Sequence, residues 1–450
     1  MDRDKNEVKP RELLSVGDGI FLTAGMIIGA LIFKAPSTVA GATSGTGTFL
    51  AAWILGAAVS LCGALVYAEL ASRHPDTGGE YAFLSRGWGK GVAFLFAWSR
   101  MTVIQTGAIA AVAFVFGDYA SQVFSLGAHS SPVWAAIAVI ALTLLNFAGT
   151  LQSKTLQKVM EIALIAGLVL FSIAALIIGG QPKPAAGGGG TLSSFGFAMI
   201  FVLLAYGGWN EAAYLAGEVR NARRNMTTVL VGGVLIVTVL YLLVNLAYLA
   251  VLGHGGIRES KAVAADVMRA IAGDRAAILL ALLVCVSVLT TMNAAIFTGA
   301  RTTYAMGRDF PVFRGLGAWR ARGSTPANAL LLQGAITLLL VAASAATPDG
   351  FNAMVAYTSP VFWTFFLLTG LTLFIFRRRR GAEPVFRVPL HPVVPALFVL
   401  MCAYMLYSSI DYVRNPDYGP KFGFAVLAGL AVMAAGIPLY FLSRKSSKAA

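Results

Sequence analysis

Charged side chains are scarce in this sequence of 450 residues. Asp, Glu, Lys and Arg make up 12% of it, whereas 58% of the residues are hydrophobic and the mean hydropathy is +0.75. A soluble domain needs a mixed, charged surface to stay dispersed, so this composition excludes an ordinary soluble protein. Apolar runs of about twenty residues, each enough to cross a ~30 Å hydrocarbon core, recur along the chain. The sequence therefore predicts an all-α integral membrane protein.

Cysteine is also rare, and the sequence motifs of common enzymes are missing. The three cysteines, Cys62, Cys285 and Cys402, lie in apolar runs, where they are small core residues and form no disulfide framework. The expected external loop 125–132 contains no cysteine, so no covalently attached partner subunit is implied. HExxH and GxSxG are absent and the four histidines are isolated, so nothing indicates an enzyme. No cofactor is implied beyond a coupling sodium ion or proton.

About twelve transmembrane helices are expected in one permease-like domain, 14–442, between the tails 1–13 and 443–450. Their predicted ranges are 14–34, 47–70, 91–117, 131–149, 156–179, 196–217, 227–252, 276–303, 327–346, 352–376, 389–410 and 422–442. No small-residue cleavage site precedes the first range, so we expect that helix to be retained. The sequence gives no sign of an oligomeric state.

Lysine and arginine gather in the tails and in every second loop. The positive-inside rule then places both termini in the cytoplasm and the protein in the cytoplasmic (inner) membrane as a multi-pass chain. The net charge of +14 is explained by this topology and by contact with anionic lipids, so no nucleic acid partner is needed. Lys34 is among the few basic residues expected at the outer face.

Two apolar segments carry glycines near their middle: 23–36, "TAGMIIGALIFKAP", and 201–219, "FVLLAYGGWNEAAYLAGEV". A helix broken within lipid leaves backbone groups unpaired, so a break is tolerated only where it lines a cavity or meets a ligand. Breaks at corresponding places in two halves of a transporter are the sequence pointer to its substrate site. The first and sixth predicted helices are therefore expected to be broken.

Four segments resemble the amino acid–polyamine–organocation superfamily of permeases, and the L-type amino acid transporter branch most of all. They are "ELASRHPDTGGEYAFL" (69–84), "AYGGWNEAAYLAGEVRNARRNM" (205–226), "MNAAIFTGARTTYAMGRD" (292–309) and "GSTPANALLL" (323–332). The resemblance implies two inverted five-helix repeats, about 14–179 and 196–376, followed by two further helices, 389–442. It also implies alternating access and an α-amino acid as substrate.

Backbone groups at the two breaks are the predicted site. Amides that open the second half of a broken helix suit a carboxylate, and carbonyls that end the first half suit an ammonium group. The candidate substrate-binding residues are Met26, Ile27, Gly29, Ala30, Leu31, Leu204, Ala205, Tyr206, Gly207 and Trp209. The carboxylate is assigned to the amides of Gly29, Ala30 and Leu31, and the ammonium group to the carbonyls of Met26, Ile27, Leu204 and Ala205. Tyr206 and Trp209 are predicted aromatic walls or gates, with simple packing as the alternative for Trp209.

The first break departs from the superfamily pattern. The resemblance leads one to expect Gly-Ser/Ala-Gly, whereas this chain has Gly29-Ala30-Leu31. Leucine disfavours positive φ. Either the helix breaks one residue earlier or the Leu31 side chain points away from the ligand.

The coupling ion is left open. Leu164 stands where many relatives carry a lysine. A sodium site would use the carbonyls of Gly25 and Ile28 with hydroxyls from the eighth helix. Ser287, Thr290 and Thr291 share a face of that helix, although their hydroxyls can instead bond to carbonyls of their own helix. Glu161 is the candidate proton carrier, with a solvated or ion-paired carboxylate as the alternative.

Transport of neutral L-amino acids is the predicted function, as an ion-coupled symporter or an exchanger. Glu211 follows the second break closely and could attract a cationic side chain. A transporter or antiporter of cationic amino acids or polyamines is therefore the runner-up. A non-transporting amino acid sensor or complex subunit is the alternative of another class.

Overall fold

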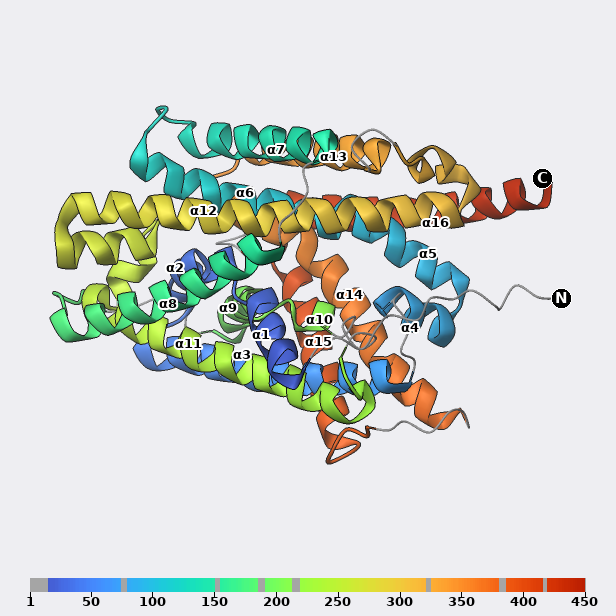
Figure 1. The fold of residues 1–450 in the computed structure, drawn as a ribbon, viewed down its shortest axis with the longest axis horizontal. Helices are drawn as coiled ribbons and strands as arrows, with labels where there is room; N and C mark the ends of the chain where they lie inside the picture. The colour runs from blue at the N-terminus through green and yellow to red at the C-terminus, as the bar shows by residue number, and fades with distance from the viewer. Residues whose placement is uncertain are drawn as a thin grey trace.

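The computed structural model describes residues 15–73, 79–149, 154–184, 191–212, 219–320, 325–379, 386–415 and 419–449. Long helices run roughly parallel and antiparallel through the molecule, as Figure 1 shows. The helices of the first half are α1 (Val16–Ile27), η1 (Ala30–Phe33), α2 (Ala35–Ala42), α3 (Thr46–Arg73), α4 (Gly79–Trp88), α5 (Lys90–Ser99), η2 (Arg100–Ile104), α6 (Gln105–Val123), α7 (Ser130–Ala148) and α8 (Lys154–Ile178). Those that follow are α9 (Leu192–Ala205), α10 (Trp209–Ala212), α11 (Ala222–Glu259), α12 (Val263–Asp309), η4 (Pro311–Gly317), α13 (Ala327–Ser344), α14 (Gly350–Arg378), α15 (Val393–Asp411) and α16 (Gly419–Ala449).

The twelve predicted spans each correspond to helix in the described part of the chain. Nine helical runs there are long and apolar enough to cross a membrane. Three shorter apolar helices, α1, Ile162–Ile178 and α9, occupy the first, fifth and sixth predicted spans. The first and sixth are short because each helix stops partway. The all-α fold with broken helices 1 and 6 is confirmed, while the exact limits of the two repeats stay a prediction.

Two spans differ in detail from their predicted form. The third is α5, a π-helical turn (η2) and α6 in one continuous run, so Arg100 lies at a local widening of the helix. The eighth, predicted over 276–303, belongs to α12, which continues to Asp309 and bends at Gly273, where φ is +80°. Glycine is needed at that bend because other residues are strained there.

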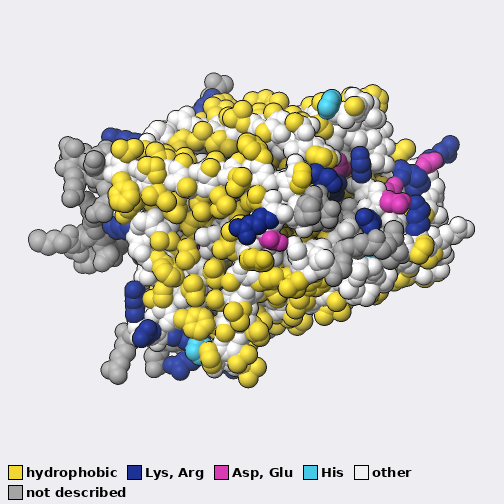
Figure 2. Space-filling view, turned by 180° about the vertical axis from the view of Figure 1, so that it is seen from behind, with side chains coloured by type: hydrophobic (Ala, Val, Ile, Leu, Met, Phe, Trp, Pro, Cys, Tyr) yellow, Lys and Arg dark blue, Asp and Glu magenta, His cyan; other side chains and the backbone are white. Residues whose placement is uncertain are grey.

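The molecular surface has the polarity of a membrane protein. Figure 2 shows hydrophobic side chains over the middle of one face, with most charged side chains toward the two ends. Leu170 and Ile177 on α8 are 69% and 79% exposed, and Leu283 on α12 is 67% exposed. Large apolar side chains exposed over so wide an area need hydrocarbon around them. These helices therefore face lipid.

A buried carboxylate fastens the helix ends on the side where α1 begins. Glu69, fully buried on α3, accepts hydrogen bonds from the guanidinium groups of Arg73 and Arg377 and, at 2.8 Å, from the amide of Val388. Arg377 lies in the last turn of α14, and Val388 precedes α15. Charge-assisted bonds to a buried carboxylate are the strong kind, so three spans are tied together at this level.

Candidate substrate site at the two helix breaks

The first break lies between α1 and η1. A capping box formed by Ser15 and Asp18 starts α1, which ends at Ile27. Ile28 is extended (φ −69°, ψ 102°), Gly29 is extended as well (φ −137°, ψ −169°), and helix resumes at Ala30. Leu31 lies within η1 and needs no positive φ. The break thus precedes Leu31.

The second break lies between α9 and α10. Helix α9 ends at Ala205, and Tyr206, Gly207 and Gly208 form a turn before helix resumes at Trp209. Gly208 has φ +110°, a conformation that side-chain-bearing residues rarely adopt. The sequence reasoning assigned Gly207 to the site, but Gly208 is the residue that makes this turn.

The two breaks touch each other. A Cβ at Gly208 would lie 2.3 Å from the carbonyl oxygen of Met26 and 2.8 Å from its carbonyl carbon. Only glycine permits this approach, because a methyl group would overlap the backbone of the other broken helix. Helix α1 packs against α10 and α11, and Figure 1 draws α1, α9 and α10 near the middle of the bundle. Residues almost two hundred positions apart therefore lie in contact.

A tyrosine that the sequence reasoning missed joins the carbonyl ends of both half-helices. The hydroxyl of Tyr241, on α11, lies 3.0 Å from the carbonyl oxygen of Ile27 and 3.2 Å from that of Ala205. These are two of the carbonyls predicted to receive the ammonium group. Since the hydroxyl has one hydrogen, it shares that hydrogen between them or serves one at a time. A hydroxyl midway along the predicted apolar span 227–252 was the available signal.

Aromatic rings pack behind the second break. Tyr206 lies with its ring centroid 5.3 Å from that of Tyr241 and 6.1 Å from that of Trp53, and all three residues are fully buried. Trp209 is 4% exposed and packs edge-on against Tyr67, at 5.1 Å between ring centroids, and against Phe366. Both predicted wall residues are enclosed by other rings in this state. For Trp209 the packing alternative accounts for its contacts.

Access to the break differs along span 1. Met26 is 41% exposed, and Gly25, Gly29 and Leu31 are partly accessible. Ile27, Ile28 and Ala30 are buried. At the second break Leu204 and Gly207 are partly accessible, whereas Ala205 is buried. The structure brings the predicted backbone groups together, and residues on both breaks are partly exposed.

The hydroxyls proposed for ion coupling bond to their own helix. Thr290 donates to the carbonyl of Val286 at 3.0 Å, and Thr291 donates to that of Ser287 at 3.2 Å. This is the alternative that the sequence left open. Thr291 still borders the first break, because a Cβ at Gly29 would lie 3.8 Å from its methyl carbon. Glu161 lies on α8, but its side chain, like that of Glu211, is outside the described part of the structure.

A buried carboxylate also supports the second break from the α4 side. Glu80 accepts a hydrogen bond from the Tyr67 hydroxyl at 2.6 Å and lies 3.4 Å from the side-chain nitrogen of Asn210. Asn210 in turn lies 3.3 Å from the amide of Gly208 through its side-chain oxygen. Arg100 at the π turn is 3.5 Å from Glu80. The polar contacts around Gly208 thus extend to α4 and to span 3.

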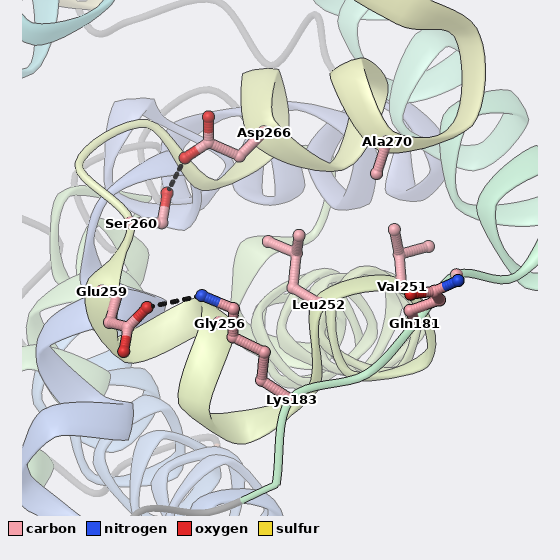
Figure 3. A pocket seen from close by; sticks show the side chains of 10 residues that line it. Gln181, Lys183, Val251, Leu252, Gly256, Glu259, Ser260, Asp266 and Ala270 are labelled. Atoms are coloured by element: carbon pink, nitrogen blue, oxygen red, sulfur yellow. Dashed lines mark hydrogen bonds and ion pairs between the residues drawn. The ribbon is translucent and has the colours of Figure 1, made fainter.

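A pocket of about 540 Å³ lies away from the breaks, between the segment after α8 and the junction of α11 with α12 (Figure 3). Lys183 and Glu259 form an ion pair of 2.8 Å there, and Ser260 bonds to Asp266 at 2.5 Å. None of the predicted site residues lines it. The meeting of the two breaks is therefore the better candidate for the substrate site.

A family model described as amino acid permease matches residues 14–433. The chain belongs to this family. The resemblance seen in the four sequence segments is confirmed, and the protein is an amino acid permease of the amino acid–polyamine–organocation superfamily.

Similar proteins cover nearly the whole permease. It is 29% identical to the b(0,+)-type amino acid transporter 1 of Homo sapiens over 95% of this chain and 87% of that protein. It is 27% identical to the serine/threonine exchanger SteT of Bacillus subtilis (strain 168) over 94% of this chain and 95% of that protein. The cystine/glutamate transporter of Homo sapiens is 24% identical over 97% of this chain and 86% of that protein. The match extends over both halves of the molecule and includes both breaks.

Proposed function

We propose that this permease exchanges neutral L-amino acids across the cytoplasmic membrane by alternating access. The observation that carries the proposal is the direct contact of the two breaks, with Gly208 against the Met26 carbonyl and Tyr241 joining the carbonyls of Ile27 and Ala205. Backbone groups at one point can recognise the part that all amino acids share. Side chains around them then select among amino acids.

In this proposal the ammonium group of the substrate binds the carbonyls of Ile27 and Ala205. Each carbonyl oxygen has a second lone pair beyond the one that Tyr241 uses. The carboxylate binds the opening amides of η1, where Gly29 is the N-cap and provides no side chain to compete with a ligand. The half-helix dipoles favour both charges of the zwitterion.

Exchange is proposed over ion-coupled uptake for two reasons. The coupling hydroxyls Thr290 and Thr291 bond to their own helix, so the structure gives no separate reason for a sodium ion. One relative, whose match covers 94% of this chain, is named as an exchanger. In an exchanger, the protein changes slowly between its inward-facing and outward-facing states when it is empty. Binding of a substrate on the opposite side makes that change fast.

The proposed orientation places both termini in the cytoplasm. Under it α1 and α10 lie in the inner half of the membrane, and η1 and α2 lie in the outer half. We further propose that the permease acts without a disulfide-linked subunit, because the segment between α6 and α7 has no cysteine.

Uptake of radiolabelled amino acids into proteoliposomes tests the function. Vesicles are loaded with unlabelled substrate, or left empty under a sodium or a proton gradient, and serine, leucine, lysine and glutamate are compared. Uptake of a neutral amino acid that requires only internal substrate supports the proposal. Uptake that requires an ion gradient would make the permease a symporter, and preference for lysine would favour the cationic alternative. Binding without uptake would favour the sensor.

A further inference from the structure

Lys34 has surroundings that the sequence did not predict. The sequence placed it on the outer side, and in the structure its side chain is buried, only 3% exposed. Its ammonium nitrogen lies 2.8 Å from a carboxylate oxygen of Asp118 at the end of α6 and 3.3 Å from one of Asp349. Asp349 is the N-cap of α14. A buried lysine keeps its charge only where carboxylates compensate for lost water, so the three groups are mutually dependent.

The cluster lies in the half of span 1 that follows the break. Lys34 is the junction between η1 and α2, whereas Asp118 and Asp349 belong to spans 3 and 10. Further bonds act at the same level: the hydroxyl of Tyr119 donates to the carbonyl of Phe33 at 3.0 Å, and Thr38 donates to Asn352 at 3.1 Å. The second half of span 1 is thus attached to two spans outside the site.

The outer route is closed in this structure. Every residue from Ile32 to Pro36 is buried, while Met26, on the other side of the break, is 41% exposed. In the proposed cycle, a path from the outside to Gly29 opens when η1 and α2 move apart from α6 and α14. That movement parts Lys34 from its carboxylates.

We propose that Lys34, Asp118 and Asp349 form an ionic latch that holds the outer gate closed and that opens in the outward-facing state. The inference rests on the proposed alternating access. In the closed state the Lys34 ammonium is shielded from water and satisfied by Asp118 and Asp349, whose side chains are 15% and 30% exposed. In the open state water solvates all three. The free-energy difference between these two arrangements of the three charges contributes to the equilibrium between the closed and the open outer gate. Only interactions that differ between two states can shift the equilibrium between them.

Thiol labelling tests the latch without requiring transport. The three cysteines are replaced by alanine, and Leu31, beside the break, is changed to cysteine as a reporter. Labelling by a membrane-impermeant maleimide is then measured from the outside of right-side-out vesicles. The isosteric variants Asp118→Asn and Asp349→Asn remove charge but keep an acceptor oxygen for Ser131 and for the amide of Asn352. We expect the double variant to label about ten-fold faster, the size of a typical coupling between two states.

A matched control exists on the same side of the protein. Lys183 and Glu259 also form an ion pair between two segments, with 2.8 Å between the ammonium nitrogen and a carboxylate oxygen. Their side chains, however, are 64% and 67% exposed. Its hydrogen bond raises the pKa of the Lys183 ammonium, so Lys183 is charged at neutral pH. Lys183→Met should leave the labelling rate unchanged, because an exposed pair contributes little to any equilibrium.

Variants in which the two charges of the ion pair are swapped distinguish a role of the latch from a general loss of structure. Lys34→Met should label faster than the parent. Lys34→Asp combined with Asp118→Lys and Asp349→Asn, which restores an opposite-charge pair without leaving two carboxylates together, should return toward the parent rate. An unchanged labelling rate in the folded Asp118→Asn, Asp349→Asn protein would overturn the latch. So would equal acceleration by Lys183→Met.

The apparent affinities on the two sides give a second readout. Weakening the latch should lower the external KM and raise the internal KM, whereas general damage would not move them in opposite directions. If the parent protein takes up no amino acid under any of the uptake conditions, the proposed function fails. The labelling rates still show whether the three charges hold the outer gate closed. If transport is intact but neither labelling nor KM shifts, the latch alone fails.

Discussion

The two helix breaks interrupt their helices with different backbone conformations. The break in span 1 uses ordinary extended backbone at Ile28 and Gly29, and a Cβ at Gly29 would meet nothing closer than 3.8 Å. The break in span 6 uses φ +110° at Gly208, where a Cβ would lie 2.3 Å from the Met26 oxygen. The first glycine leaves space beside the site, whereas the second allows the two backbones to touch. Similar glycine-containing sequences therefore have different reasons for their glycines.

Gly208→Ala should have the largest effect. The left-handed conformation costs a non-glycine residue about 1–2 kcal/mol, and the methyl group would also force the two breaks apart. We expect transport to be lost and the yield of folded protein to fall. Size-exclusion chromatography in detergent and proteoliposome uptake measure both. A folded, fully active variant would show that the breaks need not touch.

Gly29→Val should abolish transport while expression stays normal. Extended backbone suits a β-branched residue, and there is room for its Cβ, so the fold is retained. The added methyl groups would occupy the space between the break and Thr291. Uptake is compared with that of Gly29→Ala, which should retain part of the activity. Near-normal uptake by Gly29→Val would remove Gly29 from the site.

Tyr241→Phe tests the group that serves both breaks. It leaves the carbonyls of Ile27 and Ala205 without their hydroxyl donor, and a buried group that loses its partner costs about 1–3 kcal/mol of stability. The two carbonyls are then held less firmly in the position that suits the ammonium group. We expect KM to rise more than kcat falls. Tyr248→Phe is the control on the same helix, because that hydroxyl is buried with no hydrogen-bond partner among the described residues. Equal effects of the two variants would contradict a specific role for Tyr241.

Thr290→Val should have the smallest effect. Its hydroxyl bonds to the carbonyl of Val286 on its own helix, and valine preserves its shape. If the permease is an exchanger, uptake should stay within about two-fold of the parent, since such surface or self-bonded substitutions rarely exceed ~0.5 kcal/mol. Loss of uptake under a sodium gradient, with exchange intact, would instead show that this face binds an ion.

The local sequence was sufficient for the membrane class, the twelve spans and the positions of both breaks. Hydrophobic length along one helix is a local quantity, and so is a glycine in the middle of an apolar run. The resemblance segments, such as 69–84, identified the family for the same reason: they are read along the chain. The exact residue at which span 1 breaks was left open, and the backbone decided it at Ile28 and Gly29.

Contacts between distant spans could be decided only by the tertiary structure. Tyr241 reaches two carbonyls on two other spans, and Lys34, expected at the outer face, is enclosed by carboxylates from spans 3 and 10. No period or motif in the sequence records which spans pack together, because that depends on how whole helices fit against each other. The sequence by itself determined where the helices are interrupted. Packing determined that the interruptions meet, which of their carbonyls share a donor, and which charges become buried, because each of these requires two or more helices to be placed at once.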